Sequence, residues 1–243
     1  MLARRSFLGI AAVAAATAEW KGRAFPDWDE GTVMRVLVDS PWARVRKVKF
    51  SWYGWREEAR QITVRDIPGT NPAIKASSTA PGGSPVGGIG SGKVRNKLPD
   101  GVDLIFRWSS ALPVRQAKAL FRARQQGKAS QATETVEARP APGYVLEIFG
   151  LPIEAGHAGA EALSARLQKS AVLRTKTGVV RRAERAQAKL TGEEFSVSIV
   201  FPRGEAALTA ADGDIECSGE AELFGFRERF RLRDMTYLGS LEL

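Results

Sequence analysis

Large apolar residues recur at every second position in the last third of the chain, and this pattern limits the fold more than any other feature. Residues 195–201, 224–232 and 235–243 each carry such residues on one parity of the sequence. This alternation is typical of strands with one buried face. Short turns such as Asp212-Gly213 favour antiparallel pairing, because a parallel crossover needs a dozen or more residues. We therefore expect an α+β fold, mainly antiparallel sheet with a few short helices packed on it, after an N-terminal signal helix.

Further helices and strands are predicted from helical spacing, capping residues and alternation. Asp29 is placed to cap a helix over 30–39, which Ser40-Pro41 ends because the residue before proline disfavours helical backbone. A second helix begins near Pro113 and ends at Gly127. A third helix covers 159–170, and the strands before residue 195 are predicted at 47–52, 62–64, 104–108, 144–149 and 172–175.

The first eighteen residues have the three parts of an export signal. Arg4-Arg5 precedes an apolar run from Phe7 to Ala16, and Ala16-Thr17-Ala18 is a small-x-small cleavage site. The Arg4-Arg5-x-Phe7-Leu8 core resembles the twin-arginine motif, which is read by a receptor. We expect residues 1–18 to be a cleaved twin-arginine signal peptide and the protein to be periplasmic or secreted. An uncleaved anchor and an ordinary secretory signal are the alternatives.

The remaining residues, 19–243, are predicted to form a single α+β domain with a flexible insertion at about 69–99. Within this insertion, thirteen of the eighteen residues 76–93 are Gly, Pro, Ser or Thr. Such a stretch buries too little apolar surface to offset the entropy of ordering it. The segment before it is only about 50 residues long, which makes a marginal domain. We therefore favour an insertion, and a linker between two domains is the alternative.

The charge of the mature chain is moderately basic. Without Arg4 and Arg5, 34 basic and 27 acidic residues leave a formal charge of +7. A basic balance favours polyanions, which outside the cytoplasm are phospholipid headgroups, acidic polysaccharide or nucleic acid. Ordinary solubility charge is the alternative interpretation. We expect no specific nucleic-acid partner and no membrane span after signal cleavage.

No motif in the chain predicts a catalytic residue, a cofactor or a metal. His157 and Cys217 are the only residues of their kinds, so they cannot build a His/Cys zinc site, and no intrachain disulfide is available. Residues 87–93 have the spacing of a phosphate-binding loop, but Val94 stands where its Ser or Thr belongs. Asp212, Asp214 and Glu216 are interpreted as a turn rather than a calcium loop.

Four arginines near the C-terminus form the one candidate site. They share a parity opposite to the apolar residues of 224–232, so a strand would place their side chains on one face about 6.5–7 Å apart. Such a ladder is able to hold sulfate, phosphate or carboxylate groups of a polymer. The alternative is a solvated face whose arginines pair with acidic residues on neighbouring strands, for example Glu220, Glu222 or Glu242. The four residues are Arg227, Arg229, Arg231 and Arg233.

Three stretches resemble a group of uncharacterised exported proteins of acidobacterial type. They are Asp39-Ser-Pro-Trp-Ala43, Phe106-Arg-Trp-Ser-Ser-Ala-Leu-Pro113 and the terminal segment from Phe230 to Leu243. The resemblance covers most of the mature chain loosely and these stretches more closely. It implies export and supplies no activity, cofactor or site residue.

These observations predict an exported soluble protein without catalytic activity that binds a partner or belongs to the envelope. An anionic polymer or an envelope protein is the expected partner. An exported hydrolase that uses a pair of carboxylates is the alternative, because such a pair is set by spacing in three dimensions and needs no sequence motif.

We predict that protein purified from its native host begins at Glu19, because the signal peptidase cleaves after Ala18. N-terminal sequencing together with the intact mass measures this directly. Native material found in the cytosol with Met1 still attached would contradict the export prediction.

Overall fold

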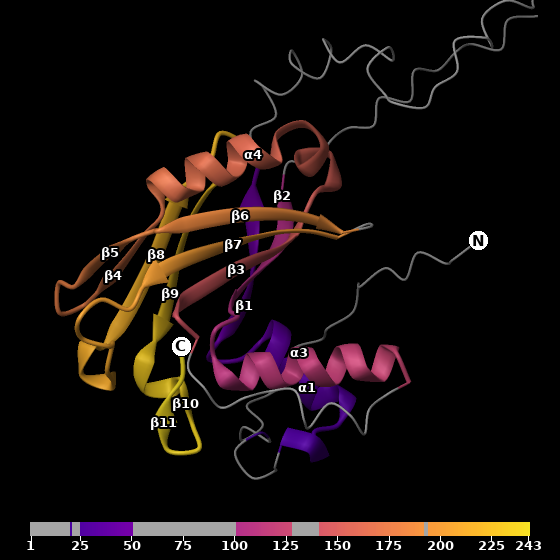
Figure 1. The fold of residues 1–243 in the computed structure, drawn as a ribbon, viewed down its shortest axis with the longest axis vertical. Helices are drawn as coiled ribbons and strands as arrows, with labels where there is room; N and C mark the ends of the chain where they lie inside the picture. Colours follow the sequence, from indigo (N-terminus) through magenta and orange to yellow (C-terminus); the bar gives the residue numbers. More distant parts are fainter. Residues whose placement is uncertain (1–19, 21–24, 51–100, 128–140, 192–193) are drawn as a thin grey trace, which may run out of the picture.

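The described part of the chain has three α-helices and eleven strands in antiparallel sheets, as the computed structural model shows, and this confirms the predicted α+β class (Figure 1). The described residues are residue 20 and residues 25–50, 101–127, 141–191 and 194–243. The predicted signal at 1–18, the strand at 62–64 and the insertion at 69–99 lie outside them.

The helices and strands follow one another in the order in which Figure 1 labels them. The helices are α1 (Glu30–Val38), α3 (Leu112–Gln125) and α4 (Ile153–Ser170), with 3-10 turns η2 (Phe25–Asp27), η5 (Ala210–Asp212) and η6 (Leu232–Asp234). The strands are β1 (Ala43–Lys49), β2 (Gly101–Trp108), β3 (Gly143–Leu151), β4 (Val172–Thr175), β5 (Val180–Arg182), β6 (Arg185–Thr191), β7 (Glu194–Pro202), β8 (Asp214–Glu220), β9 (Gly225–Arg231), β10 (Thr236–Tyr237) and β11 (Ser240–Leu241).

The strands form two main sheets and a small hairpin. Five strands in the order β1-β2-β3-β7-β6 make sheet A, and four strands in the order β5-β4-β8-β9 make sheet B. Strands β10 and β11 pair with each other. Every pairing is antiparallel, as the short connections in the C-terminal part of the sequence predicted.

Sheets A and B pack face to face through aromatic side chains. The Phe106 ring of β2 lies 5.3 Å from the Phe226 ring of β9, measured between centroids. One row further along, Trp108 lies 5.6 Å from Phe230. The inner face of each strand is apolar because side chains alternate between the two faces of a sheet. The core therefore lies mainly between two sheets, whereas the sequence predicted only helices packed on a sheet.

The helices cover the two ends of this sandwich. Helices α1 and α3 pack together beneath the sheets, and α4 lies across β6 at the opposite end (Figure 1). Asp29 caps α1 as predicted, since its Oδ1 accepts a hydrogen bond from the backbone N–H of Thr32 at 2.6 Å. Helix α4 begins six residues earlier than predicted, because a break at Gly159 separates a first turn from the apolar stretch that indicated the helix.

An aromatic cluster joins the α1 end to the C-terminal hairpin. Trp28 and Trp42 both contact the ring of Tyr237, at centroid distances of 6.0 and 6.5 Å. The indole N–H of Trp42 donates to the backbone carbonyl of Glu242.

Within the described residues, no helix combines the length and apolar character that crossing a bilayer requires.

We predict that Phe106→Ala lowers the free energy of unfolding by about 3–5 kcal/mol, because it leaves a cavity between the two sheets. Urea denaturation measures the change. Val180→Ala is the control, since Val180 is 56% exposed, and a change within about 0.5 kcal/mol is expected there. An equally small effect at Phe106 would contradict the packing of sheet A on sheet B.

Candidate anion-binding surface

Three of the four arginines of the predicted site form a ladder on β9. Arg227, Arg229 and Arg231 are exposed and alternate with Phe226, Glu228 and Phe230, which are buried. The alternation follows from the period of two along a strand, so all three guanidinium groups leave the outer face of sheet B.

The placement of Arg233 differs from the prediction. The strand ends at Arg231, and Arg233 lies in the 3-10 turn η6 that follows. Leu232 is buried as expected, but the turn ends the strand spacing of the arginines, so Arg233 is exposed without belonging to the ladder.

Strand pairing brings three further cations to the same outer face. Cross-strand registers align Arg182 of β5 with the row of Arg227, and Arg174 of β4 with the row of Arg229. Lys176 follows β4 and donates its backbone N–H to Asp214, whose register partner is Arg231. The sequence did not predict that these cations join the ladder, because alternation shows which residues share a strand face and not which strands are neighbours.

Glu216 of β8 is the carboxylate that pairs with the ladder. Its Oε2 accepts from Arg229 Nε at 2.8 Å, and its Oε1 lies 3.5 Å from Arg227 Nε. The hydrogen bond from Arg229 lowers the pKa of Glu216, and the charges of both arginines add to the effect. Glu216 therefore pairs with two guanidinium groups, and its single negative charge offsets only one of their two positive charges.

The acidic partners suggested by the sequence do not pair with the ladder in the described part of the chain. Glu222 pairs with Arg166 of α4 at 2.9 Å, and Glu242 accepts from the backbone N–H of Leu112. No ion pair of Glu220 is present among the described residues. The alternative of a face whose arginines pair with acidic residues of neighbouring strands is therefore met in part, since Glu216 of β8 pairs with Arg227 and Arg229, although Glu216 is not one of the three carboxylates suggested by the sequence.

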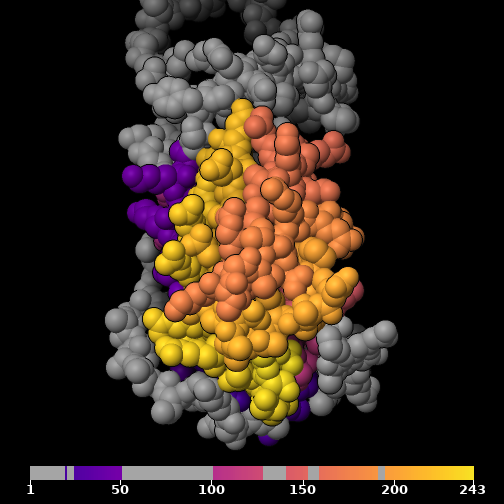
Figure 2. Space-filling view, turned by 90° about the vertical axis from the view of Figure 1, so that its left-hand side faces the viewer, coloured from indigo at the N-terminus to yellow at the C-terminus, as the bar shows by residue number. Residues whose placement is uncertain are grey.

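We name this face the basic surface. Its six cations outnumber the three carboxylates that β8 places on the same face, Asp214, Glu216 and Glu220, so it carries an excess of three positive charges. Figure 2 views this side of the molecule, where the strands of sheet B lie side by side in orange and yellow. The cations are Arg174, Lys176, Arg182, Arg227, Arg229 and Arg231, and all six are exposed.

The edge strand β1 contacts inward-facing residues of β9 through two arginines. Its atoms lie beside β9 in Figure 2. Arg46 Nε lies 3.2 Å from Oε2 of Glu228, and the guanidinium of Arg44 lies over the Phe230 ring at 5.3 Å. Glu228 is a buried carboxylate on the same face of β9 as Phe226 and Phe230. The alternation of 224–232 did not single it out, because that face is otherwise apolar.

The other residues with chemical potential have structural surroundings. Cys217 is fully buried, and burial raises the pKa of its thiol well above its ordinary value, which disfavours a nucleophilic thiolate. Asp212 accepts from the backbone N–H of Thr209 and the hydroxyl of Thr177, so it holds a turn as expected. His157 lies within α4, and residues 87–93 lie outside the described part.

Two hollows bear on the hydrolase alternative. One of about 270 Å³ lies between the end of β1 and the β8–β9 turn, and its carboxylate is Glu222. The other, of about 380 Å³, lies between α4 and β6, and its carboxylate is Glu161. Neither hollow holds the pair of carboxylates that glycoside hydrolysis needs, and no group of three metal-binding side chains is present among the described residues.

No protein-family model matches this chain, no curated protein is similar to it, and no solved structure matches it.

We predict that the stability of a Glu228→Gln variant, relative to the parent, rises between about pH 4 and pH 7. Burial raises the pKa of Glu228, against the opposing effect of Arg46 and Arg44. The folded parent therefore holds the Glu228 proton more tightly than the unfolded parent does. The parent loses stability as the pH rises through the folded pKa, whereas the Gln variant has no carboxyl to ionise at this position. Urea denaturation at several pH values measures the difference.

The exposed carboxylate Glu205 offers a matched control as Glu205→Gln, which removes the same charge from the surface. A relative stability of Glu228→Gln that stays constant or falls over this range would show that ionised Glu228 is not penalised by burial.

Proposed function

We propose that this chain is an exported, non-catalytic protein that binds an anionic polymer through the basic surface. The observation that carries the proposal is the excess of cations on one open sheet face: six Lys and Arg side chains against three carboxylates. Export is supported by the residues of the signal at 1–18 and by the resemblance to exported proteins of acidobacterial type. Both remain predictions.

The geometry of a sheet suits a repeating ligand. Cations at alternate positions along a strand lie about 6.5–7 Å apart, and neighbouring strands lie about 4.8 Å apart. A chain with a charge on each unit is able to meet several of these guanidinium groups at once. Arginine suits this role because its planar fork donates to the two oxygens of a carboxylate, sulfate or phosphate.

The strength of binding would come from many weak contacts. An exposed ion pair contributes about 0.2–1 kcal/mol, so a single charged group binds weakly. Several contacts on one polymer add through effective concentration, which favours a polymer over a small anion. Exposed charges are screened by salt, so the affinity is expected to fall steeply as ionic strength rises.

We predict that the triple variant Arg227→Gln, Arg229→Gln, Arg231→Gln binds anionic polymers about tenfold more weakly at low salt than the parent. Heparin, alginate and polyphosphate as probes separate sulfate, carboxylate and phosphate recognition. Titration at several salt concentrations measures both the affinity and its salt dependence, which should be shallower in the variant.

The matched control removes three exposed cations away from the basic surface, as Lys47→Gln, Lys169→Gln, Arg185→Gln. This control should bind nearly as the parent does. Equal losses in both triple variants would mean that only net charge matters, and the proposal would fail. Failure of all three polymers to bind, with capture of an envelope protein instead, would also overturn it.

A further inference from the structure

A buried charge cluster lies on the outer face of sheet A, away from the basic surface. Glu147 of β3 accepts two hydrogen bonds at the same oxygen, Oε2, from Arg107 Nε and from Lys118 Nζ of α3, each at 2.6 Å. Arg107 and Glu147 are both buried, and Lys118 is mostly so. Register places Arg107 directly opposite Glu147, so the pair belongs to one row of the sheet.

The cluster holds more positive charge than its carboxylate neutralises. Two cations share one carboxylate, and Arg122 adds a third cation one helical turn after Lys118. Burial lowers the pKa of Lys118, and the charges of Arg107 and Arg122 add to the lowering against the opposing effect of Glu147. An uncompensated charge of this kind is costly in a buried site unless an anion joins it.

The hydrogen-bond donors of the cluster are also incompletely used. Arg107 donates through Nε, and within the described part of the chain its two terminal Nη groups have no hydrogen-bond partner. Its guanidinium stacks on the ring of Phe149 at 4.9 Å, which holds the plane of the fork in place. The Nη pair is the part of arginine that matches the two oxygens of a carboxylate or phosphate.

The outer face of sheet A becomes more open from β3 toward β6. In one row, buried Glu147 is followed by half-buried Ser198 and exposed Gln187. In the next row, half-buried Phe149 and Ser196 lead to exposed Lys189. The cluster therefore lies at the buried end of this face, and the residues of β6 at its other end are exposed to solvent.

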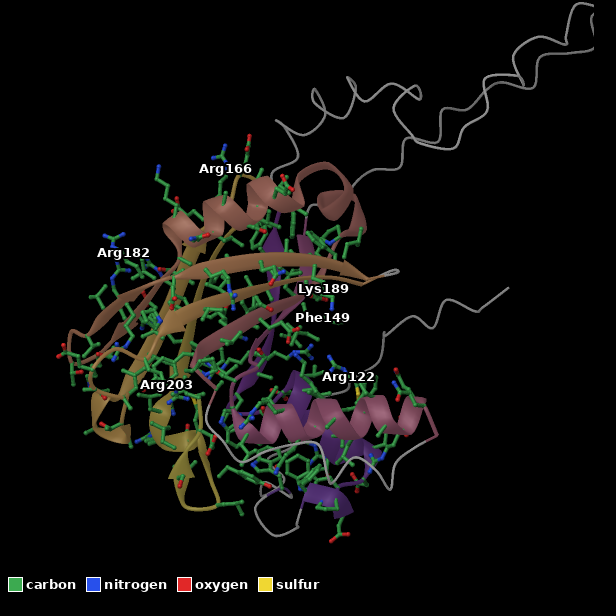
Figure 3. The ribbon with its side chains drawn as sticks, in the orientation of Figure 1. Arg122, Phe149, Arg166, Arg182, Lys189 and Arg203 are labelled. Carbon is green, nitrogen blue, oxygen red and sulfur yellow. The ribbon has the colours of Figure 1, made fainter. Side chains whose placement is uncertain are left out.

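Polar groups and cations surround this surface. The hydroxyls of Ser196 and Ser198 have no side-chain partner among the residues described. In Figure 3, Lys189, Phe149 and Arg122 lie around the space between sheet A and α3, and Arg182 of the basic surface points away on the opposite side. The two cationic regions are thus separate.

We propose that this cluster is a second binding site, which takes a small molecule through one carboxylate or phosphate group. The Nη atoms of Arg107 and the free N–H groups of Lys118 donate to the oxyanion, and Ser196 and Ser198 meet polar atoms beside it. Glu147 is a positioning residue, because its carboxylate accepts from both cations and so holds them in place. This site does not depend on polymer binding by sheet B.

The test uses NMR on the ¹⁵N-labelled protein, following the Arg107 Nε–Hε signal during titration at constant ionic strength. Inorganic phosphate and acetate are the probes, and they separate phosphate from carboxylate recognition. We expect a saturable shift with at least one probe and a dissociation constant of about a millimolar. Lys118→Gln should weaken this binding about tenfold, since it removes one charged donor and leaves the Arg107–Glu147 pair intact.

Lys176→Gln is the matched control, because it removes one lysine from the basic surface. The control should titrate like the parent. A purely structural role for the cluster predicts lower stability in Lys118→Gln and no saturable shift in the parent. That result, or equal affinities in Lys118→Gln and the parent, would overturn the proposal.

Discussion

The packing of sheet A on sheet B is the constraint on which the rest of the structure depends. Phe106 and Trp108 of one sheet meet Phe226 and Phe230 of the other, and these contacts remove the inner faces from water. Each strand has only two faces, so the arginines of β9 lie on the outside, while Glu228 is the one charged residue of that strand on the inner face. The core thereby decides where the cations of this basic chain gather.

The two outer faces use their charge differently. On sheet B the cations are exposed, they share few carboxylates, and each contributes little alone, which suits a long and repetitive ligand. On sheet A, α3 covers part of the face and brings Lys118 to a buried Arg107–Glu147 pair. Burial makes each hydrogen bond there more consequential, which suits a small and well-positioned ligand.

Much of the secondary structure follows from local signals. The cap at Asp29 and the alternation of 195–201 and 226–231 are realised as predicted, because capping and strand period depend on neighbouring residues alone. The candidate site was predicted only in part. Arg227, Arg229 and Arg231 are found from the alternation, whereas Arg174 and Arg182 join them through the order β5-β4-β8-β9, which has no local signal.

The sequence by itself determined which residues share a strand face and that Asp29 caps a helix. Only the tertiary structure decided that Glu216 compensates the ladder and that Glu147 gathers cations from β2 and α3. The physical reason is distance along the chain. Arg107, Lys118 and Glu147 are brought together by sheet register and helix packing, which depend on the whole core and not on any short segment.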